Sequence, residues 1–375
     1  MPKVSIVKCP DYDRELLTEA VTRASDLIGG IGAFVKRADT VLIKPNLLSA
    51  RPAEDAVTSH YEFVRAVIRL VKGTGGRILV GDSPGSFFIS KDIDHVYEKT
   101  GMKGVAREEG VELIKFSKST IVNGFPIADS VLDADVVITV PKLKTHSLTV
   151  MTGAIKNSFG MIPGLFKLDC HRMKPKPKDF VKTILDVYQI RKPDLCIMDS
   201  VVAMEGNGPA AGRPRKVGYV MASSSGISLD RVASEVIGIP MRKNIIMEEA
   251  LHRQPRDANL KDIDVVGEDL DECRIKGFKL PVTAHMTTHS INILPDFLYN
   301  FISKLVVFRP FIDVNLCRKC KICENSCPVD AITISDKGSV IDYNECIRCF
   351  CCHEACPYKA ISIKKNFLTK LLWRD

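Results

Sequence analysis

Short hydrophobic runs alternate with amphipathic segments through the first 240 residues of the chain. The runs are rich in valine and isoleucine, as in strands buried on both faces, and the amphipathic segments repeat with helical spacing. Strands are predicted at residues 4–7, 40–43, 77–80, 111–114, 135–140, 194–198 and 217–222, and helices at about 13–28, 58–72, 91 onward, 179–189 and 228 onward. This alternation predicts an α/β fold with a largely parallel central sheet flanked by helices.

The pattern changes after residue 240, where charged stretches and short apolar pieces replace the regular alternation. We assign residues 1–290 to the α/β domain and 291–310, apolar but interrupted by charges and a proline, to a helical connector. Residues 311–364 are predicted to form a small α+β ferredoxin-like domain. Residues 365–375 form a C-terminal tail with the pattern of a short amphipathic helix that packs back on the protein.

The small domain contains two matching cysteine runs. Each has the spacing C-x2-C-x2-C-x3-C-P, formed by Cys317, Cys320, Cys323 and Cys327 in the first run and by Cys346, Cys349, Cys352 and Cys356 in the second. The flanking sequence is duplicated too, because residues 329–334 match residues 358–363. This spacing and duplication are typical of ferredoxins that bind two 4Fe-4S clusters.

In such ferredoxins the fourth ligand of each cluster comes from the other run. We therefore expect Cys317, Cys320, Cys323 and Cys356 to hold one cluster, and Cys346, Cys349, Cys352 and Cys327 to hold the second. A zinc ribbon would use two C-x2-C pairs, and a disulfide framework is typical of short secreted chains. Cys351 lies outside the register of the run and is predicted to be a packed thiol.

The composition limits the partners and the compartment. The chain has 375 residues, 13 cysteines and a formal net charge of +8. It begins without the apolar segment of an export signal and contains no run of about 20 apolar residues that would span a membrane, so we expect a cytoplasmic protein. The modest positive charge fits a small anionic ligand and a redox partner protein; no basic run with interleaved aromatics indicates nucleic acid.

Polar residues gather where the predicted strands end, which in an open α/β sheet is where ligands bind. They are Lys44 and Asn46 after the second strand, Asp82 and Ser83 after the third, and Lys142, Lys144 and His146 after the strand at 135–140. If residues 142–146 are extended, the last three side chains share one face. The resulting cationic pocket would hold a carboxylate or phosphate. Each residue also has a plainer interpretation, as a solvated lysine or, for Asp82 and Asp199, a helix cap.

Two later segments extend the predicted pocket. Thr152 is placed to cap a helix whose free amides would favour an anion, with Lys156 and Asn157 one turn further on. The glycine-rich loop at 205–209, which contains Asn207, is placed to close over a ligand. We expect catalytic roles for His146, Lys144 and Lys156, and substrate contacts from Lys44, Asn46, Asp82, Ser83, Lys142, Asn157 and Asn207.

Several of these segments resemble the hallmark segments of the domain of unknown function 362 family. They are Lys44-Pro45-Asn46, the stretches 81–85, 141–146 and 152–160, Asp199 with residues 205–209, and residues 229–233. The resemblance covers about residues 3–290, and it implies an α/β body that is often fused to a two-cluster ferredoxin domain. It also implies a distant likeness to lactate racemases, and hence chemistry on small carboxylates.

These observations favour a redox enzyme that passes electrons between a ferredoxin-like donor and a small anionic substrate. The lysines would hold the acid group of the substrate, and His146 would donate a proton, with a pKa near neutrality. Two alternatives stay open: a non-catalytic electron carrier or maturation factor, and an isomerase-like carboxylate-binding protein with structural clusters. No motif requires a flavin or any other additional cofactor.

Overall fold

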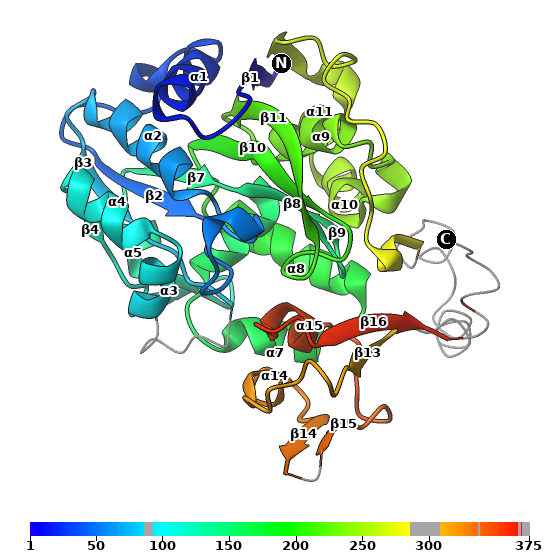
Figure 1. The fold of residues 1–375 in the computed structure, drawn as a ribbon. Helices are drawn as coiled ribbons and strands as arrows, with labels where there is room; N and C mark the ends of the chain where they lie inside the picture. Colours follow the sequence, from blue (N-terminus) through cyan, green and yellow to red (C-terminus); the bar gives the residue numbers. More distant parts are fainter. Residues whose placement is uncertain (86–92, 286–307, 337, 367–368, 370–375) are drawn as a thin grey trace.

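A ten-stranded mixed sheet forms the centre of the molecule (Figure 1). The computed structural model describes residues 1–85, 93–285, 308–336, 338–366 and 369. The strands of this sheet are β1 (Lys3–Lys8), β2 (Thr40–Pro45), β3 (Arg77–Val80), β4 (Glu112–Leu113), β7 (Val136–Val140), β8 (Lys142–His146), β9 (Val150–Thr152), β10 (Leu195–Glu205), β11 (Arg213–Ser223) and β12 (Asp264–Gly267). A separate hairpin is formed by β5 (Ser119–Val122) and β6 (Phe125–Ala128).

The sheet runs in the order β12-β1-β11-β10-β7-β2-β3-β4, with β8 and β9 attached to β10. Its pairs are parallel except for those of β11 with β1 and β10 and that of β8 with β9. The predicted α/β fold with a largely parallel sheet is therefore confirmed. The chain moves outward from β2 to β3 and β4 and then returns to place β7 on the other side of β2. This reversal is the position at which open α/β sheets form a ligand crevice.

Helices cover both faces of the sheet. They are α1 (Arg14–Asp26), α2 (Tyr61–Lys72), α3 (Ile93–Lys99), α4 (Met102–Glu109), α5 (Asp129–Leu132), α6 (Ala154–Asn157), α7 (Phe166–Met173), α8 (Pro177–Ile190), α9 (Gly226–Val236), α10 (Ile245–Arg253) and α11 (Pro255–Ala258). Side chains alternate along β2, so Val41 and Ile43 pack with α1 and α2, whereas Leu42 packs with α8 on the other face. Because successive side chains of the strand point to opposite faces, the sheet has a separate hydrophobic core on each face.

Most predicted elements of the body (residues 1–285) form within a few residues of their expected bounds, and the hairpin of β5 and β6 turns at Asn123 and Gly124. The main difference concerns β10 and β11. Each is 11 residues long, about twice the predicted length, because they pair antiparallel and extend past the edge of the other strands. The hydrophobic pattern could not show this extension, since the outer half of β11 is exposed.

The C-terminal unit (residues 308–366) contains two similar halves. Its elements are β13 (Phe308–Ile312), α14 (Ile322–Asn325), β14 (Ile332–Ser335), β15 (Gly338–Ile341), α15 (Cys351–Ala355) and β16 (Ile361–Lys365). β13 pairs with β16 and β14 with β15. The unit begins with a strand at Phe308, so the last residues of the predicted helical connector are extended; residues 291–307 of that connector, and most of the predicted tail helix, lie outside the described residues.

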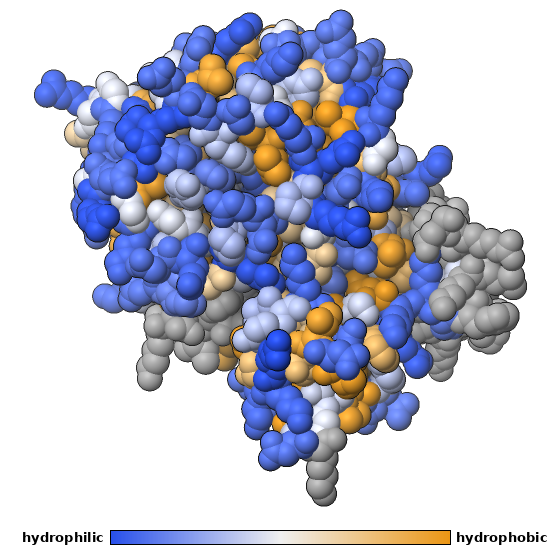
Figure 2. Space-filling model, viewed as in Figure 1, coloured by the Kyte–Doolittle hydropathy of each residue, from blue (hydrophilic) through white to orange (hydrophobic). Residues whose placement is uncertain are grey.

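The C-terminal unit packs against the body through α15 and β16, and α14, β14 and β15 lie farther away (Figure 1). In the space-filling view, hydrophilic residues cover most of the body, and hydrophobic residues are visible where the unit meets it (Figure 2). Among the helices of the described residues, none combines the length and the apolar character needed to cross a bilayer.

Candidate functional site

The ends of β2 and β3 are joined by a buried ion pair. Lys44 Nζ lies 2.6 Å from Asp82 Oδ1, and both side chains are almost fully buried. Burial lowers the pKa of Lys44, and the carboxylate of Asp82 opposes this shift by favouring the ammonium form. Asp82 also accepts a hydrogen bond from the Leu47 amide at 2.9 Å. Asp82 is therefore a charge partner and not a helix cap.

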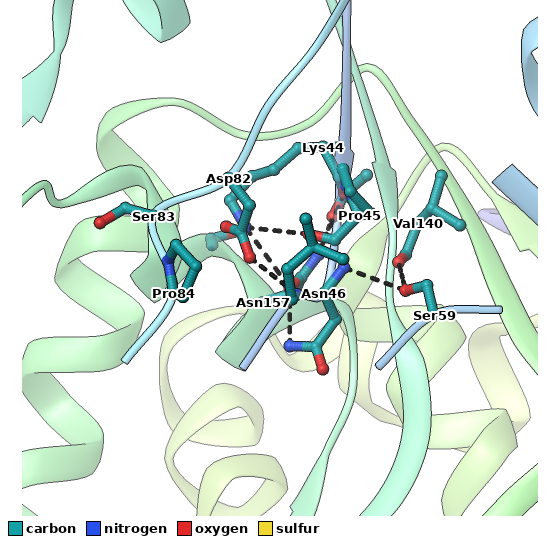
Figure 3. A network of polar contacts seen from close by, with 12 residues as sticks. Lys44, Pro45, Asn46, Ser59, Asp82, Ser83, Pro84, Val140 and Asn157 are labelled. Carbon is teal, nitrogen blue, oxygen red and sulfur yellow. Dashed lines mark hydrogen bonds and ion pairs between the residues drawn. The ribbon is translucent and has the colours of Figure 1, made fainter. Parts of the chain in front are cut away.

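Asn157 connects this pair to the neighbouring strands (Figure 3). Its Oδ1 accepts hydrogen bonds from Asn46 Nδ2 at 3.1 Å and from Lys44 Nζ at 3.4 Å. Its Nδ2 donates to Thr139 Oγ1 at 2.7 Å. The structure thus brings Lys44, Asn46, Asp82 and Asn157 together, as the sequence predicted, but in a network in which the lysine is already neutralised.

A second buried pair joins the start of β8 to the middle of β10. Lys142 Nζ donates to Asp199 Oδ2 at 2.9 Å and to the Tyr12 hydroxyl at 2.7 Å, and that hydroxyl donates to Asp199 Oδ1 at 2.8 Å. The Lys142 and Asp199 side chains have no solvent exposure. Asp199 is therefore a charge partner too, and Lys142 is directed away from the cavity described below.

Lys144 and His146 also find partners within the protein. Lys144 Nζ donates to Asn46 Oδ1 at 2.6 Å and to the Val57 carbonyl at 2.5 Å. His146 Nδ1 accepts a hydrogen bond from the Leu148 amide at 3.0 Å, so the proton of the neutral ring resides on Nε2, 3.1 Å from Glu354 Oε1. Burial, followed by the charge of Lys156, lowers the pKa of His146 to about 4. The expected near-neutral pKa of His146 is wrong, because the ring lies fully inside the protein.

The helix after Thr152 offers no free amides to an anion. Thr152 is the last residue of β9, Gly153 precedes α6, and the Asp230 carboxylate accepts hydrogen bonds from the Ala154 and Ile155 amides at 2.6 and 3.0 Å. Burial raises the pKa of Asp230 to about 7, and the two amide hydrogen bonds oppose this shift. The predicted anion site at this helix terminus is therefore wrong, because an internal carboxylate fills it.

The glycine-rich loop packs against protein and does not cover the strand ends. Asn207 Oδ1 accepts a hydrogen bond from the Val282 amide at 2.9 Å, and the Asn207 carbonyl lies 3.2 Å from His353 Nε2 in the C-terminal unit. The carbonyl of Gly208 accepts hydrogen bonds from Ser147. The predicted closure of this loop over a ligand is wrong, since these contacts use the loop to join the C-terminal unit to the body.

A cavity of about 80 Å³ lies between the strand ends and the C-terminal unit. Its lining includes Asn46, Asp82 and Ser83 from the strand ends, Lys156 and Asn157 from α6, Lys167 and His171 from α7, and Cys351 and Glu354 from α15. Pockets for larger ligands occupy about 300–1,000 Å³, so this one has room only for a small ligand. Five of the ten predicted pocket residues line it (Asn46, Asp82, Ser83, Lys156 and Asn157), whereas Lys44, Lys142, Lys144, His146 and Asn207 do not.

Lys156 is the lysine in the cavity lining that is available to bind a ligand. Within the described ranges its ammonium group has no hydrogen-bond or ion-pair partner, in contrast to Lys44, Lys142 and Lys144. Burial lowers the pKa of Lys156, and the charge of Glu354 opposes the shift. A small anion at this position would supply the missing partner.

Four lining residues with titratable side chains were not among the predicted site residues. Lys167 Nζ donates to the carbonyls of Ser83 and Pro84 at 2.8 and 2.7 Å, and burial lowers its pKa to about 7. His171 follows one turn later on α7, and burial lowers its pKa to about 3. The i,i+4 spacing of Lys167 and His171 would place both on one face of a helix, but residues 166–173 lack the hydrophobic pattern from which that helix could have been predicted. Cys351 was predicted only to be a packed thiol, and nothing in the sequence around Glu354 indicated a contact with the body.

Glu354 extends from the C-terminal unit into the lining of the cavity. Burial raises its pKa, but His146, Lys156 and His171 together outweigh this and hold the pKa at about 2, so the group is ionised. Arg51 adds a further link, because its Nη2 donates to the Cys356 carbonyl at 3.0 Å. The cavity is thus built from both parts of the chain.

The cysteines form two groups that each combine both runs. Cys317, Cys320, Cys323 and Cys356 line one small cavity with Ile312, Ile334 and Ile361. In the other group, burial and the neighbouring Cys349 and Cys346 raise the pKa of Cys352, with further contributions from Cys323 of the first group and from Cys327. All 13 cysteines are free thiols. Four thiols around a largely apolar cavity are the ligands that an iron–sulfur cluster requires.

The two cysteine loops have the same backbone conformation. Lys319 and Lys321 in the first loop have φ of 52° and 61°, and the matching Arg348 and Phe350 in the second have 59° and 63°. Left-handed non-glycine residues are uncommon, so their recurrence at equivalent positions reflects a shared loop geometry. Cys351 is buried as predicted and hydrogen-bonds to Cys349, which lowers the pKa of Cys349 and raises that of Cys351.

Comparison with known proteins agrees with both parts of the chain. The sequence profile of the domain of unknown function DUF362 matches residues 41–235, which is more than half of the chain. The chain belongs to the DUF362 family. A 4Fe-4S dicluster domain matches residues 309–357 of this DUF362 protein, so its C-terminal unit is a 4Fe-4S-binding domain.

Two similar proteins span most of the body. The DUF362 protein is 35% identical over 242 residues to the thylakoid-associated protein sll1697 of Synechocystis sp., covering 62% of this chain and 74% of that protein. The lactate racemase apoprotein from Thermoanaerobacterium thermosaccharolyticum aligns with a TM-score of 0.41 at 11% identity, covering 63% of this chain and 57% of that chain. The chain thus spans little more than half the length of the racemase.

The Lys44–Asp82 pair provides a test of the network at the strand ends. Lys44→Met leaves a buried carboxylate without its partner and is expected to lower the free energy of unfolding by about 3–5 kcal/mol. Lys44→Met combined with Asp82→Leu removes both charges and is expected to recover most of this loss, measured by denaturant unfolding. A double variant less stable than the single one would contradict the assignment of the pair.

The Asp230 contact with α6 predicts a second stability effect. Asp230→Ala leaves the buried Ala154 and Ile155 amides without an acceptor, so the free energy of unfolding is expected to fall by about 1–3 kcal/mol. Asp271→Ala, which removes an exposed acid that pairs with Arg274, serves as the control and is expected to cost less than about 1 kcal/mol, as is usual for exposed ion pairs. Equal losses in the two variants would argue against the capping role of Asp230.

Proposed function

We propose that this protein is an iron–sulfur oxidoreductase that binds two 4Fe-4S clusters and exchanges electrons with a small anionic ligand in the cavity beside Lys156. One observation carries the proposal. The short helix α15 includes Cys352, a member of the second cysteine group, and also Cys351 and Glu354, which line the cavity. The redox unit and the candidate ligand site therefore share a structural element.

The grouping of the thiols supports the ligand assignment. Cys317, Cys320, Cys323 and Cys356 are proposed to hold the first cluster, and Cys346, Cys349, Cys352 and Cys327 the second, because each group lies together although it combines two runs. Such a cluster accepts and releases single electrons at a potential set by its surroundings. Cluster ligands must be reduced thiolates, so a reducing compartment such as the cytoplasm is proposed.

The cavity residues have distinct proposed roles. Lys156 binds the anionic group, and Asn46 and Asn157, which also line the cavity, hold the strand ends in place around it. Lys167 positions Ser83 and Pro84 at the mouth through its three hydrogen bonds. Lys44, Lys142 and Lys144 act as a supporting layer, since their internal partners fix the strand ends. His146 is neutral, so its proposed role is to orient Glu354 and not to donate a proton.

The size of the cavity limits the ligand class. A volume of about 80 Å³ accommodates a few non-hydrogen atoms, and the unpaired Lys156 ammonium favours an anion. A one- or two-carbon carboxylate satisfies both requirements. Formate and acetate are therefore suitable probes of the site.

The proposal is tested by measuring cluster potentials with and without a probe anion. In anaerobically reconstituted protein, formate or acetate is expected to shift the midpoint potential of one cluster in an EPR-monitored titration. A tenfold difference in anion affinity between the two redox states corresponds to a shift of about 59 mV for one electron. Lys156→Ala is expected to abolish the shift, because it removes the unpaired ammonium group.

Lys115→Ala is the matched control, since it removes an exposed lysine on the body that pairs only with exposed Asp94. This variant is expected to respond as the native protein does. A shift that persists in Lys156→Ala would show that the anion binds elsewhere. Native potentials that respond to neither probe would instead favour a protein that carries electrons without acting on a ligand.

A further inference from the structure

The two cysteine loops share a backbone but differ in their surroundings. In the first loop the residues between the cysteines are Arg318, Lys319, Lys321 and Ile322, and the equivalent residues of the second loop are Ile347, Arg348, Phe350 and Cys351. Cys320 is exposed, whereas the equivalent Cys349 is 9% exposed. The duplicated loops have therefore diverged into one that faces solvent and one that is buried.

The direction of each loop explains this divergence. The second loop leads into α15, which contacts the body through Glu354, His353 and the Cys356 carbonyl. The first loop leads into α14, which lies farther from the body (Figure 1). Among the described residues, the first loop is thus the one that is open to another protein. Its exposed Cys320 is one of the four cysteines that line the first thiol cavity.

The surface around Cys320 is basic. Arg318, Lys319, Lys321 and the half-exposed Tyr358 line the mouth of the same cavity, and we call this set the Cys320 patch. Lys319 Nζ donates a hydrogen bond to the Asp336 backbone carbonyl at 2.9 Å. This bond keeps the Lys319 ammonium group within the patch. The patch contains three cations and no carboxylate, with an aromatic side chain of the type that is enriched in protein interfaces.

We propose that the Cys320 patch is the docking surface for a small acidic protein that carries a one-electron centre. The inference rests on the proposed function, because it assigns the Cys320 patch as the surface at which electrons enter the proposed oxidoreductase. Complementary charge accelerates association and orients the partner, and an exposed cluster ligand shortens the path between centres. In the transfer, the reduced carrier loses one electron and the oxidised cluster gains one, with no bond made or broken.

The test compares two routes of reduction. A reduced acidic bacterial ferredoxin serves as the protein reductant, and photoreduced 5-deazariboflavin serves as a small uncharged reductant that needs no docking surface. Arg318→Glu combined with Lys321→Glu is expected to lower the second-order rate constant with ferredoxin by about 10-fold or more at low ionic strength and to reduce its dependence on salt. The rate with deazariboflavin and the iron content are expected to be unchanged.

Two further variants make the result decisive. Lys261→Glu combined with Lys276→Glu makes the same change in net charge at exposed positions of the body, and this control is expected to keep the native rate. Equal losses in both double variants, or no loss in the patch variant, would overturn the inference. If the glutamates prevent cluster assembly, the neutral pair Arg318→Gln and Lys321→Gln gives the same comparison with a smaller expected loss.

The two proposals fail in different measurements. Failure of the proposed function would be seen in protein reduced by deazariboflavin, as cluster potentials that do not respond to formate or acetate. Failure of the docking inference would be seen only in the rate with ferredoxin, while the response to the anions stays intact.

Discussion

A buried ammonium group is stable only where oxygen atoms replace its water, and this constraint organises the strand ends of the protein. Lys44 and Lys142 satisfy it with carboxylates, and Lys144 satisfies it with an amide and a carbonyl oxygen. These partners hold the ends of β2, β3, β7 and β10 in fixed relative positions. Lys156 follows a different arrangement, because the space in front of it is a cavity. The lysine that lacks an internal partner is the one best placed to bind a ligand.

The same constraint links the body to the C-terminal unit. Glu354 is an ionised carboxylate that the unit places beside His146, Lys156 and His171, and these neighbours lower its pKa. Arg51 and His353 add hydrogen bonds to backbone carbonyls across the same contact. The position of α15 therefore depends on electrostatic complementarity between two parts of the chain with unrelated folds.

Much of this fold was predictable, because buried parallel strands and surface helices leave regular hydrophobic patterns. The cysteine spacing predicted a cluster-binding domain. The strand ends predicted that Asn46, Asp82 and Ser83 share one cavity, and the segment after Thr152 added Lys156 and Asn157 to it. The partners of buried charges were not predictable: nothing local links Lys142 to Tyr12, or Asp230 to an amide 76 residues away. Glu354 was missed for the same reason, since its role depends on how two domains pack.

The construction of the cavity has a consequence for its enclosure. Its lysine and amide groups come from the body, whereas Cys351 and Glu354 come from the C-terminal unit. If the unit moved away from the body, this side of the cavity would open to water. The enclosure of the cavity and the position of α15 therefore depend on the same packing contact.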